Sequence, residues 1–557
     1  MTRALQLLSI SILLAGAAEL FAAPAKKPNL IILVADDLGW NDVGYHGSDI
    51  RTPAIDRLAK TGIQLDRFYV CPICSPTRAG LLTGRYPHRF GLRDTVIPPW
   101  RKFGLDLSEQ TLPEVFGKAD YKRRACIGKW HLGHYMRAYH PIERGFTHFY
   151  GHYNGAIDYF TLLREGERDW HRNFKPSADA GYSTELLGDE AVRFIKDSRA
   201  GEPFLLYLPF NAPHGPLQAP RKYLDEYGYD ENAGSFTRKR KKAAAGKDAY
   251  GAQGQGNRKR QTFAAMVTAM DVQIGRILDT LDSEGLTENS IVLFFSDNGA
   301  TLKIGGSNKP LPGAKHSVRE GGVRVPAVIR WPAGLKGSRK FDTLMGYIDV
   351  LPTLLGLAGG EKIPGGKPLD GIDLSGVLQG EAKAPQRAFY LGQEALVSQE
   401  WKLIEGRLYR IDSDPTEKRD VSPANPSVLK RLSEQLQAFE KLAGKVKVAP
   451  YGSGRQDFKA PTQWRIEAGP KKKIGAHNAG AFRDGNRSTA EQLSARRSRY
   501  PGRVAERSHH LRVHLDPQPL YPRGCRQVAA LCRADNKKAW GAPAVCDPLR
   551  RRAGRGI

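Results

Sequence analysis

The stretch Cys74-Ser75-Pro76-Thr77-Arg78-Ala79-Gly80-Leu81-Leu82-Thr83-Gly84-Arg85 decides the fold and indicates where the chemistry takes place. Ser75 can cap a helix, the proline after it suits the first helical position, and Gly84 can end the helix. Cys74 is then expected at a helix N-terminus, where free N–H groups and the helix dipole favour an anion. Arg78, four residues on, lies on the same face and adds positive charge. The sequence therefore predicts an anion-binding site around Cys74.

Three short apolar runs elsewhere predict strands that are buried on both faces of a parallel sheet. They are residues 29–35, 204–208 and 290–296. Helical patterns lie between them, notably residues 263–281, so the predicted fold class is α/β. Because ligands bind beyond the carboxyl ends of the strands in open α/β sheets, the loops after these runs are expected to converge on one pocket.

Polar residues in these loops form a candidate metal site. Asp36 and Asp37 follow the first run, and Asp297 and Asn298 follow the third. They offer oxygen ligands only, which suits Ca²⁺ or Mg²⁺ and argues against zinc. Adjacent carboxylates repel each other, so the two pairs favour a cation nearby. His214, after the second run, is expected in the same pocket.

Several motifs resemble those of the type I sulfatases. The run at residues 74–85 matches that family's signature, and Lys129-Trp130-His131-Leu132-Gly133 matches its second signature. His214 within Ala212-Pro213-His214-Gly215-Pro216, and Lys315 before residues 320–326, also stand in the family's order. The resemblance covers residues 27–465. Residues 155–160 look most like the branch around arylsulfatase B and N-acetylgalactosamine 4-sulfatase.

The resemblance implies a reaction, namely hydrolysis of a sulfate ester, with a carbohydrate as the expected substrate. Cys74 would be oxidised to formylglycine by a formylglycine-generating or sulfatase-maturing enzyme and would supply the nucleophilic oxygen. Arg78 and His131 would hold that group, Lys129 and Lys315 would bind the sulfate, and His214 would contact the ester oxygen. One Ca²⁺ would be held by Asp36, Asp37, residue 74, Asp297 and Asn298.

The resemblance also implies an alkaline-phosphatase-like fold, a mixed, mostly parallel sheet between helices with a smaller C-terminal antiparallel sheet and helix. Strand-like pieces at 401–405 and 408–411 precede a helical pattern at about 427–442. We therefore predict a signal peptide at residues 1–23, a sulfatase catalytic domain at 27–360, a C-terminal subdomain at 361–465 and a tail at 466–557. Residues 233–261 are polar, basic and of low complexity, as expected for a solvated, mobile loop.

The distribution of charge and the number of cysteines narrow the partners, disulfides and metals that this protein is expected to have. The net charge is +27, but residues 451–557 hold 23 Lys and Arg against 8 Asp and Glu, so they carry +15 of it. A disordered basic tail, a glycan-binding tail and an out-of-frame translation are three interpretations of this segment, and no nucleic acid is expected as a partner. The six scattered cysteines predict neither a disulfide scaffold nor a zinc site.

The N-terminal segment predicts export. Arg3 precedes an apolar stretch from Leu5 to Ala18, and small residues follow near a plausible cleavage point. The expected location is periplasmic or extracellular, or lysosomal in a eukaryote. A membrane anchor is the alternative, but the stretch is short for a bilayer span.

The sequence is also compatible with two other functions. A phosphonate or phosphate ester hydrolase of the same superfamily would share most of these motifs. A non-catalytic protein that binds sulfated glycans would keep Cys74 unoxidised and would use the basic segments to hold a polyanion.

Overall fold

The computed structural model describes residues 26–93, 95–198, 201–236, 250–360, 366–446, 448–449 and 451–466. All of them fall within one compact unit, residues 1–475. The predicted signal peptide and residues 467–557 of the predicted tail lie outside the described residues. Within the described ranges, no helix is both long and apolar enough to cross a membrane.

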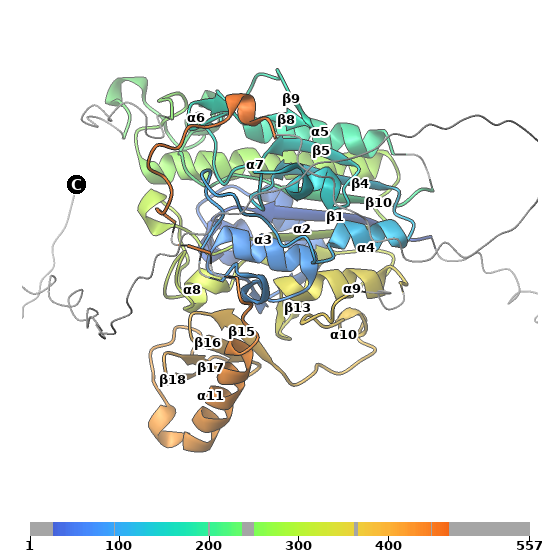
Figure 1. Cartoon of the computed structure of the whole chain (residues 1–557), viewed down its shortest axis with the longest axis vertical. Helices are drawn as coiled ribbons and strands as arrows, with labels where there is room; N and C mark the ends of the chain where they lie inside the picture. Colours follow the sequence, from blue (N-terminus) through green and yellow to red (C-terminus); the bar gives the residue numbers. More distant parts are fainter. Residues whose placement is uncertain are drawn as a thin grey trace, which may run out of the picture. The chain divides into compact units, whose positions relative to one another are not determined.

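A ten-stranded sheet forms the centre of the molecule (Figure 1). The strand order is β13-β2-β12-β11-β1-β10-β4-β5-β8-β9. The five central strands are parallel, with β1 between β10 and β11. They are β1 (Asn29–Ala35), β10 (Phe204–Pro209), β11 (Ser290–Ser296), β4 (Arg123–Lys129) and β5 (His148–His152). The three predicted apolar runs are thus confirmed as neighbouring central strands.

Antiparallel pairing appears towards both edges of this sheet, which makes it mixed but mostly parallel, as predicted. The outer strands are β12 (Ala327–Arg330), β2 (Ile63–Leu65), β13 (Arg339–Phe341), β8 (His171–Arg172) and β9 (Lys175–Pro176). Two small ribbons accompany the sheet, β3 (Phe68–Tyr69) with β14 (Met345–Gly346) and β6 (Leu163–Arg164) with β7 (Glu167–Arg168).

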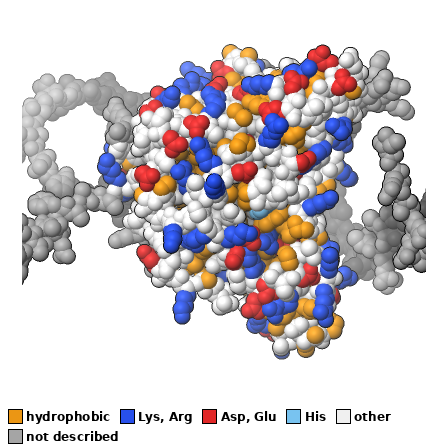
Figure 2. Space-filling model, turned by 180° about the vertical axis from the view of Figure 1, so that it is seen from behind, with side chains coloured by type: hydrophobic (Ala, Val, Ile, Leu, Met, Phe, Trp, Pro, Cys, Tyr) orange, Lys and Arg blue, Asp and Glu red, His pale blue; other side chains and the backbone are white. Residues whose placement is uncertain are grey.

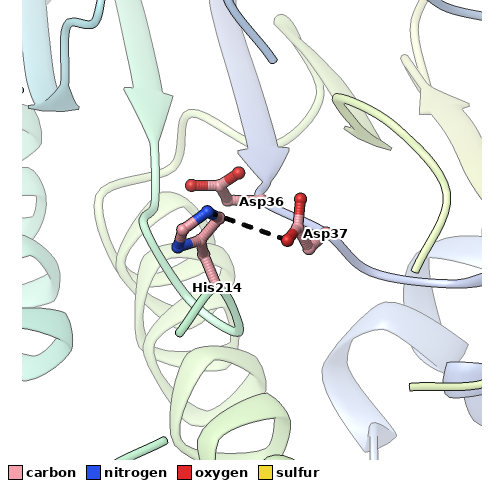
Figure 3. A group of neighbouring side chains, drawn as sticks. All are labelled: Asp36, Asp37 and His214. Atoms are coloured by element: carbon pink, nitrogen blue, oxygen red, sulfur yellow. Dashed lines mark ion pairs between the residues drawn. The ribbon is translucent and has the colours of Figure 1, made fainter. Parts of the chain in front are cut away.

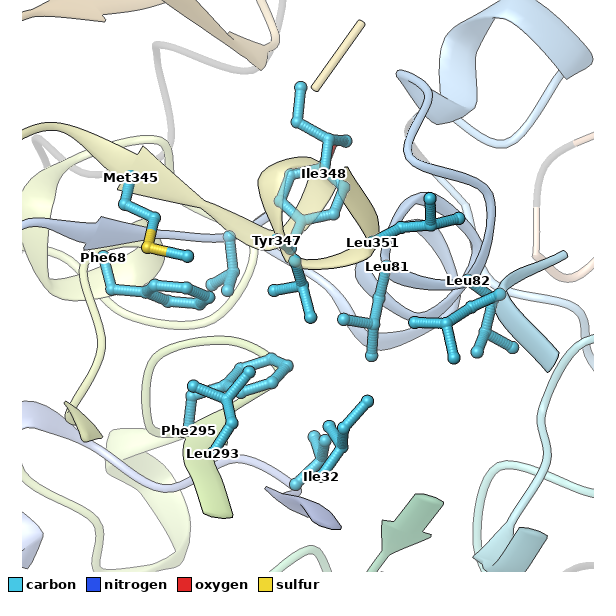
Figure 4. Close-up of a cluster of buried hydrophobic side chains, with 14 of the residues drawn as sticks. Ile32, Phe68, Leu81, Leu82, Leu293, Phe295, Met345, Tyr347, Ile348 and Leu351 are labelled. Carbon is cyan, nitrogen blue, oxygen red and sulfur yellow. The ribbon is translucent and has the colours of Figure 1, made fainter. Parts of the chain in front are cut away.

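Helices cover both faces of the sheet because successive side chains of a strand point to opposite faces. Ile32 of β1 packs into one apolar cluster, and Leu33 packs into another. The first cluster includes residues of α3 (Cys74–Thr83), α4 (Leu112–Lys118) and α9 (Val350–Leu357). The second includes residues of α2 (Pro53–Thr61), α5 (Ser183–Lys196), α6 (Arg221–Asp225) and α7 (Lys259–Ser283). In Figure 4, Leu81 of α3 lies close to Ile32 of β1 in the first cluster.

A second, four-stranded antiparallel sheet carries one long helix, as predicted. It consists of β15 (Ala388–Gly392), β16 (Ala395–Ser398), β17 (Trp401–Ile404) and β18 (Arg407–Arg410), with α11 (Pro426–Glu440). Leu432 of α11 is fully buried against Leu396, Leu403 and Leu408 of the sheet. Two short helices, α8 (Glu320–Val323) and α10 (Ser375–Gln379), are the remaining α-helices of the described part of the chain.

The insertion at residues 233–261 differs in part from the expected solvated loop. Residues 237–249 lie outside the described residues, but α7 already begins at Lys259. Before it, the backbone N–H of Gly251 donates to the Asp158 carboxylate at 2.7 Å. The C-terminal end of the insertion is therefore helical, and the residues just before α7 are attached to the protein body.

Charged side chains of both signs share the surface. On the face drawn in Figure 2, Lys and Arg side chains are interspersed with Asp and Glu rather than gathered into one basic patch. This agrees with the uneven distribution of the +27 net charge along the chain.

Candidate active site

The predicted site residues meet at the carboxyl edge of the central strands. Asp36 and Asp37 follow β1, Asp297 and Asn298 follow β11, and Lys129 is the last residue of β4. Cys74 begins α3, while His214 and Lys315 lie in loops, after β10 and before α8 respectively. Because neighbouring parallel strands end at the same edge, residues separated by more than 200 positions lie side by side.

The start of α3 lies two residues before the sequence-based expectation. The helix begins at Cys74 with Ile73 as the capping residue, so Ser75 is not the cap. The Ser75 hydroxyl instead donates to the backbone O of His131 at 3.0 Å, and it accepts from the N–H of Ile97 at 3.3 Å. These tertiary contacts tie the helix to neighbouring loops. Gly84 ends the helix in the left-handed conformation, φ 65°, as predicted.

Three cationic side chains pair with three carboxylates in the interior. Arg78 donates to Asp297 from Nε at 3.0 Å and from Nη2 at 2.7 Å. Lys129 Nζ lies 2.5 Å from Asp36 Oδ2, and Lys315 Nζ lies 2.6 Å from Asp37 Oδ1. The side chains of Arg78, Lys129, Asp36 and Asp297 are fully buried. Such charges are tolerated in an interior only because they are paired.

The acidic group meets the requirements of a cation site. A carboxylate oxygen of Asp36, the Sγ of Cys74 and a carboxylate oxygen of Asp297 all lie within 4.8 Å of one another. The same limit holds for a carboxylate oxygen of Asp36, one of Asp37 and a ring nitrogen of His214. Two buried oxygens, Asp36 Oδ1 and Asn298 Oδ1, have no hydrogen-bond partner among the described residues. Burial and the charge of Asp36 raise the pKa of Asp297 to about 6 despite Arg78 and Lys129. A hard cation would satisfy the two oxygens and offset the repulsion, so the donor set fits Ca²⁺ or Mg²⁺.

His214 faces the same carboxylates (Figure 3). Its Nε2 lies 3.8 Å from Asp37 Oδ2, and its Nδ1 lies 2.6 Å from the backbone O of Gly215. Burial and the charge of Lys315 lower the pKa of His214 to about 3. For Asp37, burial raises the pKa, but the charges of Lys315 and His214 outweigh it and hold the pKa well below the usual range.

Cys74 is a buried thiol with a histidine neighbour. Its Sγ lies 3.4 Å from Nδ1 of His131, and only 2% of the residue is exposed. Burial raises the thiol pKa, although the charges of Lys129 and Lys315 oppose this. A neutral thiol is a poor nucleophile, so an unmodified Cys74 is not suited to attack. Burial and the positive charge of Lys129 lower the pKa of His131.

The backbone is held in an uncommon conformation at two of these positions. Asp37 has φ 69° and His131 has φ 56°, values in the left-handed region that residues other than glycine rarely adopt. Such conformations persist only where the surrounding contacts hold them, and they are frequent at functional sites.

A cavity of about 470 Å³ opens over Cys74, His131, His214 and Lys315. Its outer wall contains Gly155, together with residues that sequence reasoning missed, among them Thr95, Arg164, His316 and Tyr451. At Gly155 a Cβ would stand 2.4 Å from the His131 ring, so only glycine fits there. Residues 155–160 had been singled out for their resemblance to one branch of the family. No sequence pattern predicted that Arg164 or Tyr451 would line the same cavity as Cys74.

Comparisons with known proteins agree with this geometry. The family model described as Sulfatase matches residues 28–360. Arylsulfatase J of Mus musculus is 30% identical over 498 residues, covering 78% of this chain and 79% of the relative. N-acetylgalactosamine-6-sulfatase of Homo sapiens is 32% identical over 399 residues, covering 67% of this chain and 70% of the relative. The crystal structure of Ps i-CgsB in complex with k-i-k-neocarrahexaose superimposes with a TM-score of 0.65 at 30% identity, covering 75% of this chain and 94% of that one.

These similarities do not single out the arylsulfatase B branch, because they include arylsulfatase J and an N-acetylgalactosamine-6-sulfatase. All of these relatives are sulfatases, in agreement with the motifs and the fold described above. The chain therefore belongs to the type I sulfatase family and is a sulfuric ester hydrolase.

Proposed function

We propose that this protein hydrolyses sulfate esters on a carbohydrate, with a formylglycine made from Cys74 as nucleophile and one bound Ca²⁺. The observation that carries the proposal is the placement of Cys74. It begins α3, its Sγ belongs to the acidic group of Asp36 and Asp297, and it lines one cavity with His131, His214 and Lys315.

The calcium ligands in this proposal are Asp36, Asp37, Asp297, Asn298 and residue 74. All but Cys74 offer oxygen, and two of the oxygens, Asp36 Oδ1 and Asn298 Oδ1, have no hydrogen-bond partner among the described residues. The ion would supply positive charge that polarises the nucleophilic oxygen and neutralises a sulfate oxygen.

The cationic side chains would then hold the sulfate of the substrate. Lys129 and Lys315 contribute two positive charges near the helix N-terminus where residue 74 stands. In a buried site their attraction for an anion is much stronger than in water, and it grows as charge develops on the sulfate oxygens.

The protein's remaining groups would move protons. One hydroxyl of the hydrated aldehyde at residue 74, held by Arg78 and His131, would attack sulfur, and the bond from sulfur to the ester oxygen would break. The proton of the attacking hydroxyl would end on the departing alcohol. His214 protonates or stabilises the departing alcohol oxygen. The second hydroxyl then loses its proton, and sulfate leaves as the aldehyde re-forms. Water hydrates the aldehyde and completes the cycle.

Relatives support a carbohydrate as the substrate. One is named for N-acetylgalactosamine, and one solved structure contains a neocarrahexaose. We further propose that the protein is exported and that a formylglycine-generating or sulfatase-maturing enzyme acts on Cys74 first. The division into residues 1–23, 27–360, 361–465 and 466–557 remains a prediction.

Two measurements test this proposal against its alternatives. The ratio of activities on a sulfate ester and a phosphate ester separates a sulfatase from a phosphate or phosphonate hydrolase. The mass of the proteolytic peptide containing residue 74 should be about 18 Da lower than that of the cysteine form. An active preparation in which this peptide is wholly unmodified would exclude the formylglycine nucleophile.

A further inference from the structure

The chain returns to the active-site cavity after α11. Residues 443–446, 448–449 and 451–466, here called the strap, leave the small sheet and end beside the β6–β7 ribbon; Figure 1 shows this path in orange. Several hydrogen bonds attach the strap to the rest of the protein, three of them spread along its length. Gly444 N–H donates to His88 O at 3.0 Å, Tyr451 O accepts from Trp100 Nε1 at 2.9 Å, and Trp464 Nε1 donates to Arg164 O at 3.0 Å.

Tyr451 is the strap residue that lines the cavity over Cys74. Its residue surface is 45% exposed, which is unusual for a large aromatic side chain. The ring stands at 75° to that of Trp100, with 5.1 Å between centroids, and Arg455 lies over the same Trp100 ring at 4.9 Å. One side of Tyr451 is thus held by the protein, and the rest of the residue remains accessible at the cavity.

The strap also braces the other parts of the outer wall. Arg101 donates to Ala449 O at 3.0 Å, close in sequence to the cavity-lining residues Pro98 and Pro99. Trp464, only 1% exposed, binds the backbone of Arg164, another cavity-lining residue. The strap therefore contributes Tyr451 to the outer wall and supports the backbone of Arg164, whereas the inner wall contains Cys74 of α3 and residues of loops at the sheet edge.

The size of the cavity indicates what the outer wall is for. A volume of about 470 Å³ is far more than a sulfate group needs, given that one water occupies about 30 Å³ of liquid. The charged side chains at the base of the cavity, such as Lys315, account for binding of the sulfate group. The rest of the cavity volume is therefore available to the part of the substrate that carries the sulfate. A sugar ring has an apolar face of C–H groups and a polar rim, which matches an amphipathic aromatic side chain.

We infer that Tyr451 is a specificity-determining residue whose ring packs against the apolar face of the sugar that bears the scissile sulfate. The inference rests on the proposed function, because it takes the substrate to be a sulfated carbohydrate. The inner site then recognises the sulfate, and the strap recognises the sugar.

The test compares Tyr451→Ala and Tyr451→Phe with the control Tyr135→Ala. Tyr135 is similarly exposed, at 44%, but does not line the cavity. For a sulfated oligosaccharide, Tyr451→Ala should lower kcat/KM about tenfold, mainly through KM, as expected for loss of one aromatic contact. Inhibition by inorganic sulfate should be unchanged, because the inner site is intact. Tyr451→Phe and Tyr135→Ala should stay close to the wild type.

Equal losses in oligosaccharide turnover and in sulfate inhibition would overturn the inference, as would an unchanged KM in Tyr451→Ala. Binding of the same oligosaccharide to Cys74→Ala and to Cys74→Ala/Tyr451→Ala, measured by calorimetry, tests Tyr451 without turnover. A wild type that binds the sugar through Tyr451 but releases no sulfate would refute the proposed function and leave the role of Tyr451 standing. Equal affinities of the two Cys74→Ala proteins would refute the role of Tyr451 alone.

Discussion

At the scale of single residues, the site depends on carboxylates that are crowded in the interior. Asp297 accepts two hydrogen bonds from Arg78, yet burial and Asp36 still raise its pKa to about 6. Asp36 Oδ1 has no hydrogen-bond partner among the described residues. Crowding of this kind favours a divalent cation.

Asp297→Asn is expected to weaken Ca²⁺ binding by at least about 100-fold, since the substitution removes one negative charge from the ligand set. Titration calorimetry on the chelator-treated protein measures this directly. The matched control is Asp349→Asn, which alters an equally buried aspartate that pairs with Arg387. It should lower stability but leave the Ca²⁺ affinity unchanged. Equal affinities for wild type and Asp297→Asn would show that the acidic group is not the metal site.

Much of the inner site could be predicted from the sequence because each of its residues belongs to a local motif. Asp36 and Asp37 end an apolar run, and Cys74 stands at a recognisable helix start. The role of Ser75 could not be predicted, because its hydroxyl bonds to His131 O rather than to its own helix. The outer wall was missed for a similar reason. Tyr451 is held at the cavity by tertiary contacts such as that with Trp100, and no local sequence pattern predicts such contacts.

At the scale of elements, buried ion pairs join the small sheet to the helix that follows the Lys315 loop. Lys402 of β17 lies 2.7 Å from Glu320 Oε1 of α8 and 2.8 Å from Glu417 Oε1, and all three side chains are fully buried. Arg319, next to Glu320, also binds Glu417 at 3.0 Å. The cluster fixes α8, and the chain just before α8 carries Lys315.

Lys402→Met is expected to destabilise the protein by about 3–5 kcal/mol, because two carboxylates would be left buried without their shared cation. Urea unfolding measures this loss. The control Arg410→Met removes a partly exposed partner of Asp412 from the adjacent strand and should cost at most about 1 kcal/mol. If the two variants were equally stable, the buried cluster would contribute no more than a surface ion pair.

A second element-scale contact makes stability depend on pH. Asp271 of α7 accepts the N–H groups of Ala54 at 2.9 Å and Ile55 at 2.8 Å, in the first turn of α2. Burial nevertheless raises its pKa from 3.8 to about 7. The folded state therefore holds this proton more tightly than the unfolded state does. The resulting stabilisation is complete below about pH 4 and is lost as the pH rises through 7.

The contribution of Asp271 to the free energy of unfolding should fall by up to ~4 kcal/mol between pH 4 and pH 7. Asp271→Asn cannot ionise, so its stability should change less over this range than that of the wild type. Denaturant unfolding at several pH values gives the difference curve. Asp279→Asn, on an exposed part of the same helix, should keep the wild-type profile. A flat difference curve between wild type and Asp271→Asn would contradict the shift.

At the scale of the whole molecule, the chain forms a large α/β sheet layer, a small antiparallel sheet and a strap that returns to the cavity. The described part of this architecture ends at Ile466. The two sheets could be predicted because periodicity and strand-end polarity are local properties. The strap could not be predicted, because it has no regular structure beyond η11 (Thr462–Trp464) and is held by tertiary contacts.

Removal of residues 467–557 is expected to leave oligosaccharide turnover unchanged and the Tm within about 2 °C, because the described core lies within residues 26–466. Calorimetry and sulfate release check both properties. A truncation after Leu442 is the comparison, since it also removes the strap with its buried Trp464. It should lower the Tm and reduce turnover of the oligosaccharide. A fall in oligosaccharide turnover on loss of residues 467–557 alone would instead favour a glycan-binding tail.

In the proposed reaction residue 74, once oxidised, attacks the sulfur of a sulfate ester. Release of inorganic sulfate from a sulfated oligosaccharide, compared between the matured wild type and Cys74→Ala, tests it most directly. We expect steady release by the wild type and a loss of at least about 1,000-fold in Cys74→Ala, with the folded structure retained. Comparable release by the two proteins would contradict the account.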